Sequence, residues 1–472
     1  MTQDICWLPA AELAEGIRNK TFSSQEVVQA HLDRFDALNP TLNAIVTFAP
    51  DPLALAKEAD AAIARGDDLG PIHGVPFTLK DCVEVAGLRA TQGSKILADN
   101  VSTRDSTVYE RLKGAGGILL GKTNLPEFAL WWETDNLLFG PTQNPWKLGY
   151  TPGGSSGGEA ASLATGMSPM GVGTDLGGSI RQPSSFCGLA GLKPTLGRVP
   201  YTRVVPQTLF RAIHVGPMAR NVQDVSLELS IMAGPDGEDI YAPPVPVPDY
   251  TDLDGPLPKL RVGWSPTGGT AVEEQVQQVV ASAAEALSGL GLEVEPVEIP
   301  GLGTRDGGVI SSAVYVVEGK AYLSEVIRGR ESELTPLLRK RYVDAPDKTF
   351  EEYLSASFDW ESLKWEVGEY FTRYDIFLCP TVPMPAYRAG REEFVIGGET
   401  MGARHSLRAT VPWDLTGSPA MNVPFGWSGE GLPIGVQLVA RHFDEHTLLR
   451  VAKALEGCHG DRRRPAIAAN VK

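Results

Sequence analysis

Two glycine- and serine-rich segments hold the groups best suited to chemistry in this chain. The first is Gly153–Gly158 (GGSSGG), and the second is Gly173–Arg181 (GTDLGGSIR). The first could be a flexible linker, but Trp146, Pro152 and the small-residue run at 159–165 flank it closely. Glycine-rich backbone between such flanks lets N–H groups approach an anion. The two segments therefore predict a site that combines serine hydroxyls with backbone donors.

A serine hydroxyl becomes an effective nucleophile only when a base takes its proton. The seven histidines offer no persuasive partner, so a lysine kept neutral is the physical alternative. Burial lowers the pKa of a lysine because it disfavours the charged form. Lys80 follows the strand-like run at 75–79, and Lys122 follows the run at 118–120. On this reasoning alone, the two lysines are equally valid candidates for the base.

Three motif matches indicate other activities but lack the local structure that those activities need. Residues 116–123 (GGILLGKT) match a phosphate-binding loop, yet their central Ile-Leu-Leu is expected to be a strand, which cannot wrap around phosphates. Residues 442–446 (HFDEH) match a zinc-protease motif, but Asp444 is expected to begin the closing helix and leave His442 outside it. Residues 153–157 (GGSSG) match the nucleophile elbow of α/β-hydrolase esterases, without the preceding strand and without a partner histidine.

The elements that must position these residues follow an α/β pattern. Helices are expected over 1–65, where Ser23 and Glu26 form a capping box. From about 70 to 220, short β-prone runs alternate with helical stretches, which is typical of an α/β sheet covered by helices on both faces. A proline-rich stretch at 241–250 is the one plausible linker, and the alternation of strands and helices resumes after it. One continuous sheet and two domains are both compatible with this pattern.

Composition excludes several classes of function. The chain has 472 residues, and 42 Lys and Arg against 58 Asp and Glu give a net charge of −16. This charge argues against binding to nucleic acid or to an anionic membrane. No run approaches the roughly 18 apolar residues of a spanning helix, and the N-terminus lacks the features of a secretory signal. Five scattered cysteines without a CxxC pair favour a reducing compartment, so a cytoplasmic location is expected.

Several stretches resemble the amidase signature hydrolases. They are GVPFTLKD (74–81), TPGGSSGG (151–158) and GTDLGGSIRQPSSFCGLAGLKPT (173–195), with further matches at 216–225, 375–385, 415–426 and 432–449. The resemblance covers most of the chain, and its 23-residue central motif is highly specific. It implies the amidase signature fold, an α/β fold with a large mixed central β-sheet covered by helices on both faces. A single domain over 1–472 is implied, in which a helical part (1–65) precedes the signature core (about 70–220) and a C-terminal part (about 256–472) completes the same sheet.

The resemblance also implies a Ser-cisSer-Lys triad and decides between the two lysines. Ser179 would be the nucleophile, Ser155 the bridging residue and Lys80 the neutral base that draws a proton through Ser155. The Gly154–Ser155 peptide bond would be cis. Asp175 and Arg181 are expected to brace the loop by hydrogen bonds, and Ser156 to cap the helix that follows.

Substrate contacts are implied at two further places. The backbone N–H groups of an oxyanion hole are each worth about 3 kcal/mol in the transition state. Glycine at two of these positions would leave room for the substrate carbonyl. Family members line the acyl pocket with the segment that corresponds to 128–132, where aromatic side chains suggest an apolar substrate. The implied residues are Leu176, Gly177, Gly178 and Ser179 for the oxyanion hole, and Ala129, Leu130 and Trp132 for the pocket.

The expected activity is an amidohydrolase that cleaves the C–N bond of small apolar or aryl amides through an acyl-enzyme on Ser179. Esters and carbamates are further candidate substrates because only the leaving group changes, so a urethanase-like role is included. No metal and no organic cofactor are expected. The expected partner is a small-molecule substrate, with no nucleic acid and no membrane, and the chain is expected to be a monomer or a homodimer.

Two other functions compete with this one. The competing function within the family is that of the glutaminase subunit of a tRNA-dependent amidotransferase, although residues 201–217 depart from the sequence that this subunit usually carries. The competing function from another class is that of a binding protein that has lost catalysis. Nothing about binding requires Lys80, Ser155 and Ser179 together, so catalysis is the favoured function.

Overall fold

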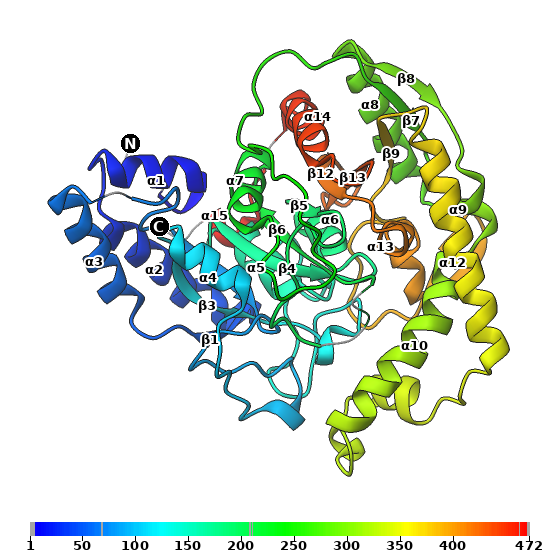
Figure 1. The fold of residues 1–472 in the computed structure, drawn as a ribbon, viewed down its shortest axis with the longest axis horizontal. Coiled ribbons are helices and arrows are strands. Elements are labelled where there is room, and N and C mark those ends of the chain that lie inside the picture. The colour runs from blue at the N-terminus through cyan, green and yellow to red at the C-terminus, as the bar shows by residue number, and fades with distance from the viewer. Residues whose placement is uncertain (1–4, 68, 207–208, 210, 462, 470–472) are drawn as a thin grey trace.

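One mixed sheet of eleven strands runs through the centre of the structure (Figure 1). This computed structural model describes residues 5–67, 69–206, 209, 211–461 and 463–469. Neighbouring strands run parallel from β3 through β2 to β4 and from β9 through β7 to β8, and the other neighbours are antiparallel. In order across the sheet, the strands are β1 (Ile45–Phe48), β3 (Ile118–Thr123), β2 (Pro76–Lys80), β4 (Met170–Asp175), β6 (His214–Ala219), β5 (Ala190–Lys193), β12 (Ala420–Trp427), β13 (Pro433–Ala440), β9 (Ile376–Pro380), β7 (Arg261–Trp264) and β8 (Glu293–Pro296).

Helices cover both faces of this sheet, as the sequence predicts. Successive side chains of a strand point to opposite faces, and β9 shows the division clearly. Ile376 and Leu378 join the core that includes α7, α8 and α14, whereas Phe377 and Cys379 join the core shared with α10, α12 and α13. These helices are α7 (Val222–Met232), α8 (Glu274–Gly289), α14 (Glu445–Cys458), α10 (Gly307–Val326), α12 (Phe350–Tyr370) and α13 (Val411–Thr416).

The N-terminal part is helical with one exception. Its helices are α1 (Ala10–Arg18), α2 (Ser24–Leu42) and α3 (Pro52–Arg65), and the capping box of Ser23 and Glu26 is confirmed. The expectation of helices alone is wrong at Ile45–Phe48, which forms the edge strand β1. This short segment pairs with β3 beside Gly121, where a Cβ would lie 2.5 Å from the carbonyl oxygen of Thr47. A tertiary contact, and not local periodicity, therefore fixes this strand.

The proline-rich stretch at 241–250 does not divide the sheet. It lies between α7 and β7, and β7, β8 and β9 belong to the same sheet as the strands that precede it. Two features of the C-terminal part were not predicted: strand β12, which joins β5 to β13, and the separate hairpin of β10 (Glu393–Ile396) and β11 (Glu399–Gly402). Strand β12 contains Pro424 at a register shift, which weakens its sequence signal.

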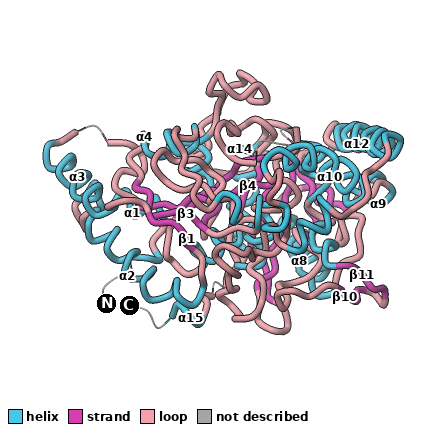
Figure 2. Tube along the Cα trace, turned by 90° about the horizontal axis from the view of Figure 1, so that it is seen from below, coloured by secondary structure: helices cyan, strands magenta, loops and turns pink. Residues whose placement is uncertain are grey.

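The remaining helices are short or lie at the periphery. None of the helices in the described residues combines the length and the apolar character needed to cross a bilayer. Figure 2 shows α3 at one edge of the molecule and α12 at the opposite edge. The other α-helices are α4 (Thr107–Gly114), α5 (Gly157–Ala164), α6 (Arg181–Cys187), α9 (Pro300–Thr304), α11 (Pro336–Leu338) and α15 (Ala466–Ala469).

Candidate active site

Lys80 is the last residue of β2 and lies at the carboxyl end of this strand, where α/β sheets commonly carry chemistry. Its Nζ lies 2.6 Å from the Oγ of Ser155 and 2.8 Å from the Oγ1 of Thr174, and it donates a hydrogen bond to each. The side chain is fully buried. Burial lowers the pKa of Lys80 to about 8 because the interior disfavours the charged ammonium. About a tenth of the amine is therefore neutral at pH 7, and about half at pH 8.

Lys122 lies in the neighbouring strand β3 and is held differently. Its Nζ is 3.4 Å from the Oδ1 of Asp81 and donates to the backbone carbonyls of Asp81 (3.1 Å) and Arg89 (2.9 Å). The second carboxylate oxygen of Asp81 accepts hydrogen bonds from Thr91. Lys122 is thus part of a buried ion pair and makes no contact with either serine. The geometry favours Lys80 as the base, which is also what the family resemblance implies.

The two glycine-rich segments, which carry Ser155 and Ser179, lie side by side. The N–H of Ser156 donates to the carbonyl of Ser179 at 3.2 Å, which joins the segments. The Gly154–Ser155 peptide bond is cis, as the resemblance implies. Ser179 is 9% exposed, whereas Lys80 and Ser155 are 0% and 1% exposed. Ser179, the residue expected to attack the substrate, is therefore the most exposed of the three.

Asp175 and Arg181 brace the loop that carries Ser179, as expected. The Oδ1 of Asp175 accepts from the N–H of Gly178 at 2.5 Å, and its Oδ2 accepts from the Nε of Arg181 at 3.0 Å. Arg181 also reaches Asp414 at 2.7 Å and Gln437 at 2.8 Å. Although burial opposes it, the Arg181 guanidinium holds the pKa of Asp175 well below its usual value. This network fixes the loop in one conformation.

The backbone N–H groups of the loop fall into two sets. Those of Leu176, Gly177 and Ser179 have no acceptor in the part of the chain that the structure describes. That of Gly178 already donates to Asp175, so it is not available to an oxyanion in this conformation and the expectation for it needs correction. Glycine is required there for another reason: its φ is +123°, and a Cβ would lie 2.3 Å from the Oγ1 of Thr410. Three donors therefore remain for the oxyanion.

The surface beside Gly177 is apolar. A Cβ on Gly177 would lie 3.4 Å from the Cγ2 of Val411 and 3.9 Å from the Cδ1 of Leu407. Leu407 ends the 3₁₀ helix η6 (Ala403–Leu407), and Val411 begins α13. Leu176 packs against the same group of side chains. An acyl group held next to the loop would therefore meet hydrocarbon.

The three residues suggested for the pocket have different surroundings. Leu130 packs into a core cluster with Phe128 and side chains of α10, so core packing accounts for its apolar character. Ala129 is partly buried and has a φ of +57°. Trp132 is buried, and its Nε1 has no hydrogen-bond partner among the described residues. Its backbone lies against the proposed triad, since a Cβ on Gly154 would be 2.8 Å from the carbonyl carbon of Trp132. Trp132 is thus the pocket candidate with the closest link to the site.

Two residues near Lys80 were not identified from the sequence. Thr174, which bonds Lys80, lies directly before Asp175 in the second motif, and its position there was the available signal. Glu159 is fully buried and accepts a hydrogen bond from the Oγ1 of Thr123 at 2.9 Å and another from Thr78. Burial raises the pKa of Glu159 to about 8, because neither threonine brings a compensating positive charge. Its sequence neighbourhood, a helix start, gave no sign of this environment.

Several smaller expectations can be compared with the structure. Ser156 occupies the N-cap position of α5, but its side chain makes no capping bond; its Oγ instead lies 3.4 Å from the backbone N and O of Thr174. The expectation that it caps the helix is therefore wrong. Strand β3 does cover residues 118–123, and His442 does precede α14, bonding the carbonyl of Thr416. Among the described residues, no group of three or more His, Cys, Asp and Glu side chains is placed to hold a metal ion.

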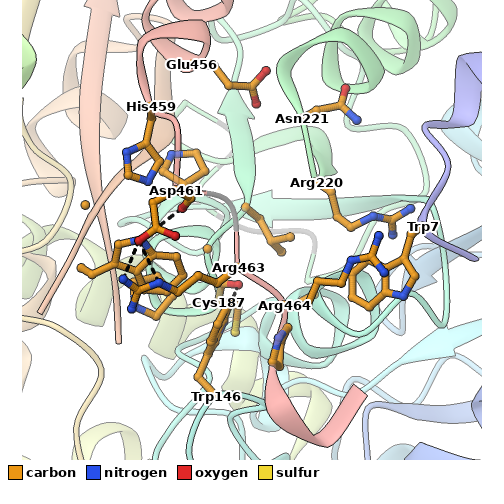
Figure 3. A pocket seen from close by; sticks show the side chains of 18 of the residues that line it. Trp7, Trp146, Cys187, Arg220, Asn221, Glu456, His459, Asp461, Arg463 and Arg464 are labelled. Atoms are coloured by element: carbon orange, nitrogen blue, oxygen red, sulfur yellow. Dashed lines mark hydrogen bonds and ion pairs between the residues drawn. The ribbon is translucent and has the colours of Figure 1, made fainter. Parts of the chain in front are cut away.

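A pocket of about 300 Å³ lies apart from these residues (Figure 3). Cys187, the last residue of α6, lines it, so it adjoins the end of that helix distant from Ser179. Its walls come from both ends of the chain, and Figure 3 shows Arg463 bonded to Asp461 on one side and Arg464 beside Trp7 on the other. None of the residues predicted for the active site lines this pocket.

Known proteins resemble the chain over nearly its whole length. A family model described as Amidase matches residues 26–449. An acylamidase from Rhodococcus erythropolis is 36% identical over 465 residues, which cover 96% of this chain and 96% of that protein. A glutamyl-tRNA(Gln) amidotransferase subunit from Carboxydothermus hydrogenoformans is also 36% identical, over 485 residues that cover 96% of this chain and 97% of that protein.

Solved structures give the same result. A bacterial aryl acylamidase of the amidase signature enzymes family matches with a TM-score of 0.91 and 27% identity, and the match covers 99% of each chain. The resemblance inferred from the motifs is thereby confirmed, together with the mixed α/β fold. The chain therefore belongs to the amidase signature family, whose members hydrolyse the C–N bonds of amides.

Proposed function

We propose that the protein cleaves small apolar or aryl amides through an acyl-enzyme formed on Ser179. One observation carries this proposal: the fully buried Nζ of Lys80, with its pKa lowered to about 8, donates to the Oγ of Ser155 at 2.6 Å. A fully buried lysine without a carboxylate contact is costly, so its role as a neutral base offers a reason for its presence. The protein would need no metal for this reaction.

In the proposed first step, the hydroxyl of Ser179 loses its proton to Ser155 while Ser155 passes its own proton to Lys80. The Oγ of Ser179 forms a bond to the amide carbon, and the carbonyl oxygen takes the negative charge. The N–H groups of Leu176, Gly177 and Ser179 would donate to this oxygen, each contributing about 3 kcal/mol to the stability of the transition state.

The C–N bond then breaks, and Lys80 returns a proton through Ser155 to the leaving nitrogen. Water attacks the acyl-enzyme in the second half of the reaction, with Lys80 again as the base, and releases the carboxylic acid and free Ser179. An ester differs only in its leaving group, so the same steps would release the same acid from it. An aryl carbamate would lose its aryloxide and leave a carbamoyl group on Ser179, which water would release as a carbamic acid.

The surroundings of the loop support an apolar acyl group. Leu407 and Val411 lie beside Gly177, and Leu176 packs against the same side chains. The acyl group would thus be bound mainly by hydrocarbon contacts. Cys82, Cys187, Cys379 and Cys458 are free thiols, which is in keeping with a cytoplasmic location.

The glutaminase subunit of an amidotransferase is the second candidate, because relatives of that kind match as well as the acylamidase does. The segment 201–217, whose sequence argued against it, includes residues 207, 208 and 210, which lie outside the described residues. Glutamine carries an α-ammonium and an α-carboxylate, and both would need polar partners in the pocket. The apolar side chains beside Gly177 are a poor match for these groups.

A hydrolysis screen separates the two candidates. Anilides, aliphatic amides, amino-acid amides, glutamine and aryl carbamates would be compared at equal concentration, with the Ser179→Ala protein as the blank. We expect the highest kcat/KM with an apolar anilide and little activity with glutamine. Preferred hydrolysis of glutamine would support the glutaminase function and contradict the proposed substrate class.

A further inference from the structure

The pocket between the two chain ends has a positively charged corner. The Cζ of Arg464 lies 4.3 Å from the ring centroid of Trp7, and the Cζ of Arg220 lies 5.6 Å from the same centroid. Figure 3 shows both arginine side chains beside Trp7. The pKa of Arg220 is lowered to about 10, chiefly by burial and in part by the positive charges of Arg34 and Arg464. The two guanidinium groups that line the pocket therefore lie close enough to repel each other.

No carboxylate neutralises this corner. Arg220 donates three hydrogen bonds, all of them to backbone carbonyls, and forms no ion pair with a described residue. Arg464 contacts the ring of Trp7 and has neither a hydrogen bond nor an ion pair in the part of the chain that the structure describes. Asp224 attracts Arg220, but it does not line the pocket, and it accepts from two N–H groups of α1. A bound anion would explain two neighbouring guanidinium groups without a carboxylate.

The two carboxylates that do line the pocket already have partners. Asp461 accepts a hydrogen bond from the Nε of Arg463 at 2.9 Å, and Glu456 accepts one from the N–H of Val222 at 3.2 Å. Figure 3 shows Asp461 and Arg463 on the side of the pocket opposite Trp7. An anion beside Trp7 would therefore meet mainly positive charge.

The rest of the pocket is lined largely by hydrocarbon. The rings of Trp146 and Trp427 pack edge to face, with their centroids 4.9 Å apart. Their Nε1 groups donate to the backbone carbonyls of Cys187 (2.9 Å) and Asp461 (3.2 Å), so neither indole has a free donor to offer a ligand. The other apolar side chains of the lining include Leu189, Pro424 and Pro433.

We propose that this pocket binds an aromatic carboxylate. The carboxylate would lie between Arg220 and Arg464, because the planar guanidinium group matches its two oxygens. The ring would lie against Trp7 and the apolar lining. A cavity of about 150 Å³ accommodates benzene, so the 300 Å³ of this pocket leaves room for two fused rings. The site uses none of the residues assigned to the reaction, and its ligand would join the two ends of the chain.

Isothermal titration calorimetry with 2-naphthoate tests the proposal. The Ser179→Ala protein would be used, so that binding is measured without turnover and does not depend on the proposed acyl-enzyme. We expect one saturable site. The neutral alcohol 2-naphthalenemethanol should bind at least about tenfold more weakly, because it cannot pair with the two guanidinium groups. Acetate and inorganic phosphate at the concentration of 2-naphthoate should not displace it, because they lack the ring.

Arg464→Gln tests the location of the site. Arg464 is exposed, so the fold should tolerate the change, as a melting temperature would verify. Its loss should weaken 2-naphthoate binding by roughly 10- to 100-fold. Arg391→Gln is the matched control, because Arg391 is also exposed, lies 4.7 Å from the ring centroid of Phe394 and does not line the pocket. This control should leave binding unchanged, whereas Trp7→Leu should weaken it several-fold by removing the aromatic surface.

Four results would overturn the proposal. One is the absence of 2-naphthoate binding at millimolar concentrations. Another is equal affinity for the neutral alcohol, which would show that the arginines bind no anion. Displacement by phosphate at equal concentration would show an anion site without preference for a ring. Binding that Arg464→Gln leaves unchanged would place the ligand elsewhere on the protein, including the active site.

Discussion

The buried amine of Lys80 should make the stability of the protein depend on pH, and Lys80→Met should remove this dependence. The pKa of Lys80 falls from 10.5 to about 8 on folding, since burial disfavours the charged form. A difference of this size corresponds to about 3 kcal/mol of folding free energy at pH values below 8. Part of the stability of the protein is therefore lost in order to hold this amine in the interior.

The sign follows from proton binding. Between pH 8 and pH 10.5, the amine is protonated in the unfolded chain and neutral in the folded protein, so the free energy of unfolding rises with pH. Below pH 8 the amine is protonated in both states, and its contribution no longer changes. Methionine has a similar length and no titratable group. The substitution also removes the hydrogen bonds to Ser155 and Thr174, which adds a constant to the difference in the free energy of unfolding between the two proteins.

Urea denaturation of both proteins at pH 7, 8, 9 and 10 measures this effect. The free energy of unfolding of the unmodified protein minus that of Lys80→Met should change by less than about 0.5 kcal/mol between pH 7 and 8. It should then increase by up to about 3 kcal/mol as the pH approaches 10.5. Titrating groups that do not interact with Lys80 cancel in the difference. Glu159 and Cys82 contribute to it as well, because the charge of Lys80 lowers the pKa of each. A difference that does not change with pH would refute the claim that burial lowers the pKa of Lys80.

Three further predictions concern the same site. The kcat/KM for an anilide should fall about tenfold per pH unit below the pKa of Lys80 near 8, and a rate that is flat between pH 6 and 8 would argue against a lysine base. Burial raises the pKa of Glu159 from 4.5 to about 8, so between these pH values the folded protein binds one more proton than the unfolded chain and loses stability as the pH rises. The urea stability of Glu159→Gln relative to the unmodified protein should therefore increase from pH 5 to pH 8. A stability difference that stays constant over this range would contradict the prediction. Gly178→Ala should cost about 2 kcal/mol or more, because of its φ of +123° and the contact with Thr410, whereas Gly177→Ala should cost less than about 1 kcal/mol; equal losses in thermal denaturation would show that the loop is not constrained as described.

Much of the fold could be predicted because local patterns and tertiary structure agree over most of the chain. The capping box of α2 and the alternation of strands and helices after residue 70 are of this kind. Strands β1 and β12 were missed because pairing with distant strands, and not their own periodicity, determines them. The proline-rich stretch at 241–250 could not be interpreted locally, since only the sheet shows that its two sides belong together.

The site shows the same limit at the level of single residues. Spacing alone left Lys80 and Lys122 equivalent, and the family motifs or the contacts of each amine are needed to separate them. Glycine at position 178 was predicted to make room for a substrate carbonyl. In the structure, the positive φ of Gly178 and its close contact with Thr410 are the reasons why this residue must be glycine. The burial of Glu159 depends on Thr78 and Thr123, which lie 81 and 36 residues away in the sequence.

Covalent labelling of the nucleophile tests the central claim most directly. The protein would be treated with an aryl phosphonyl fluoride and analysed by intact-mass spectrometry and peptide mapping. A single adduct is predicted on the peptide that contains Ser179, with none on Ser179→Ala and a rate roughly 10²- to 10⁴-fold lower for Lys80→Met. An adduct on another residue, or anilide hydrolysis retained by Ser179→Ala, would contradict the proposed mechanism.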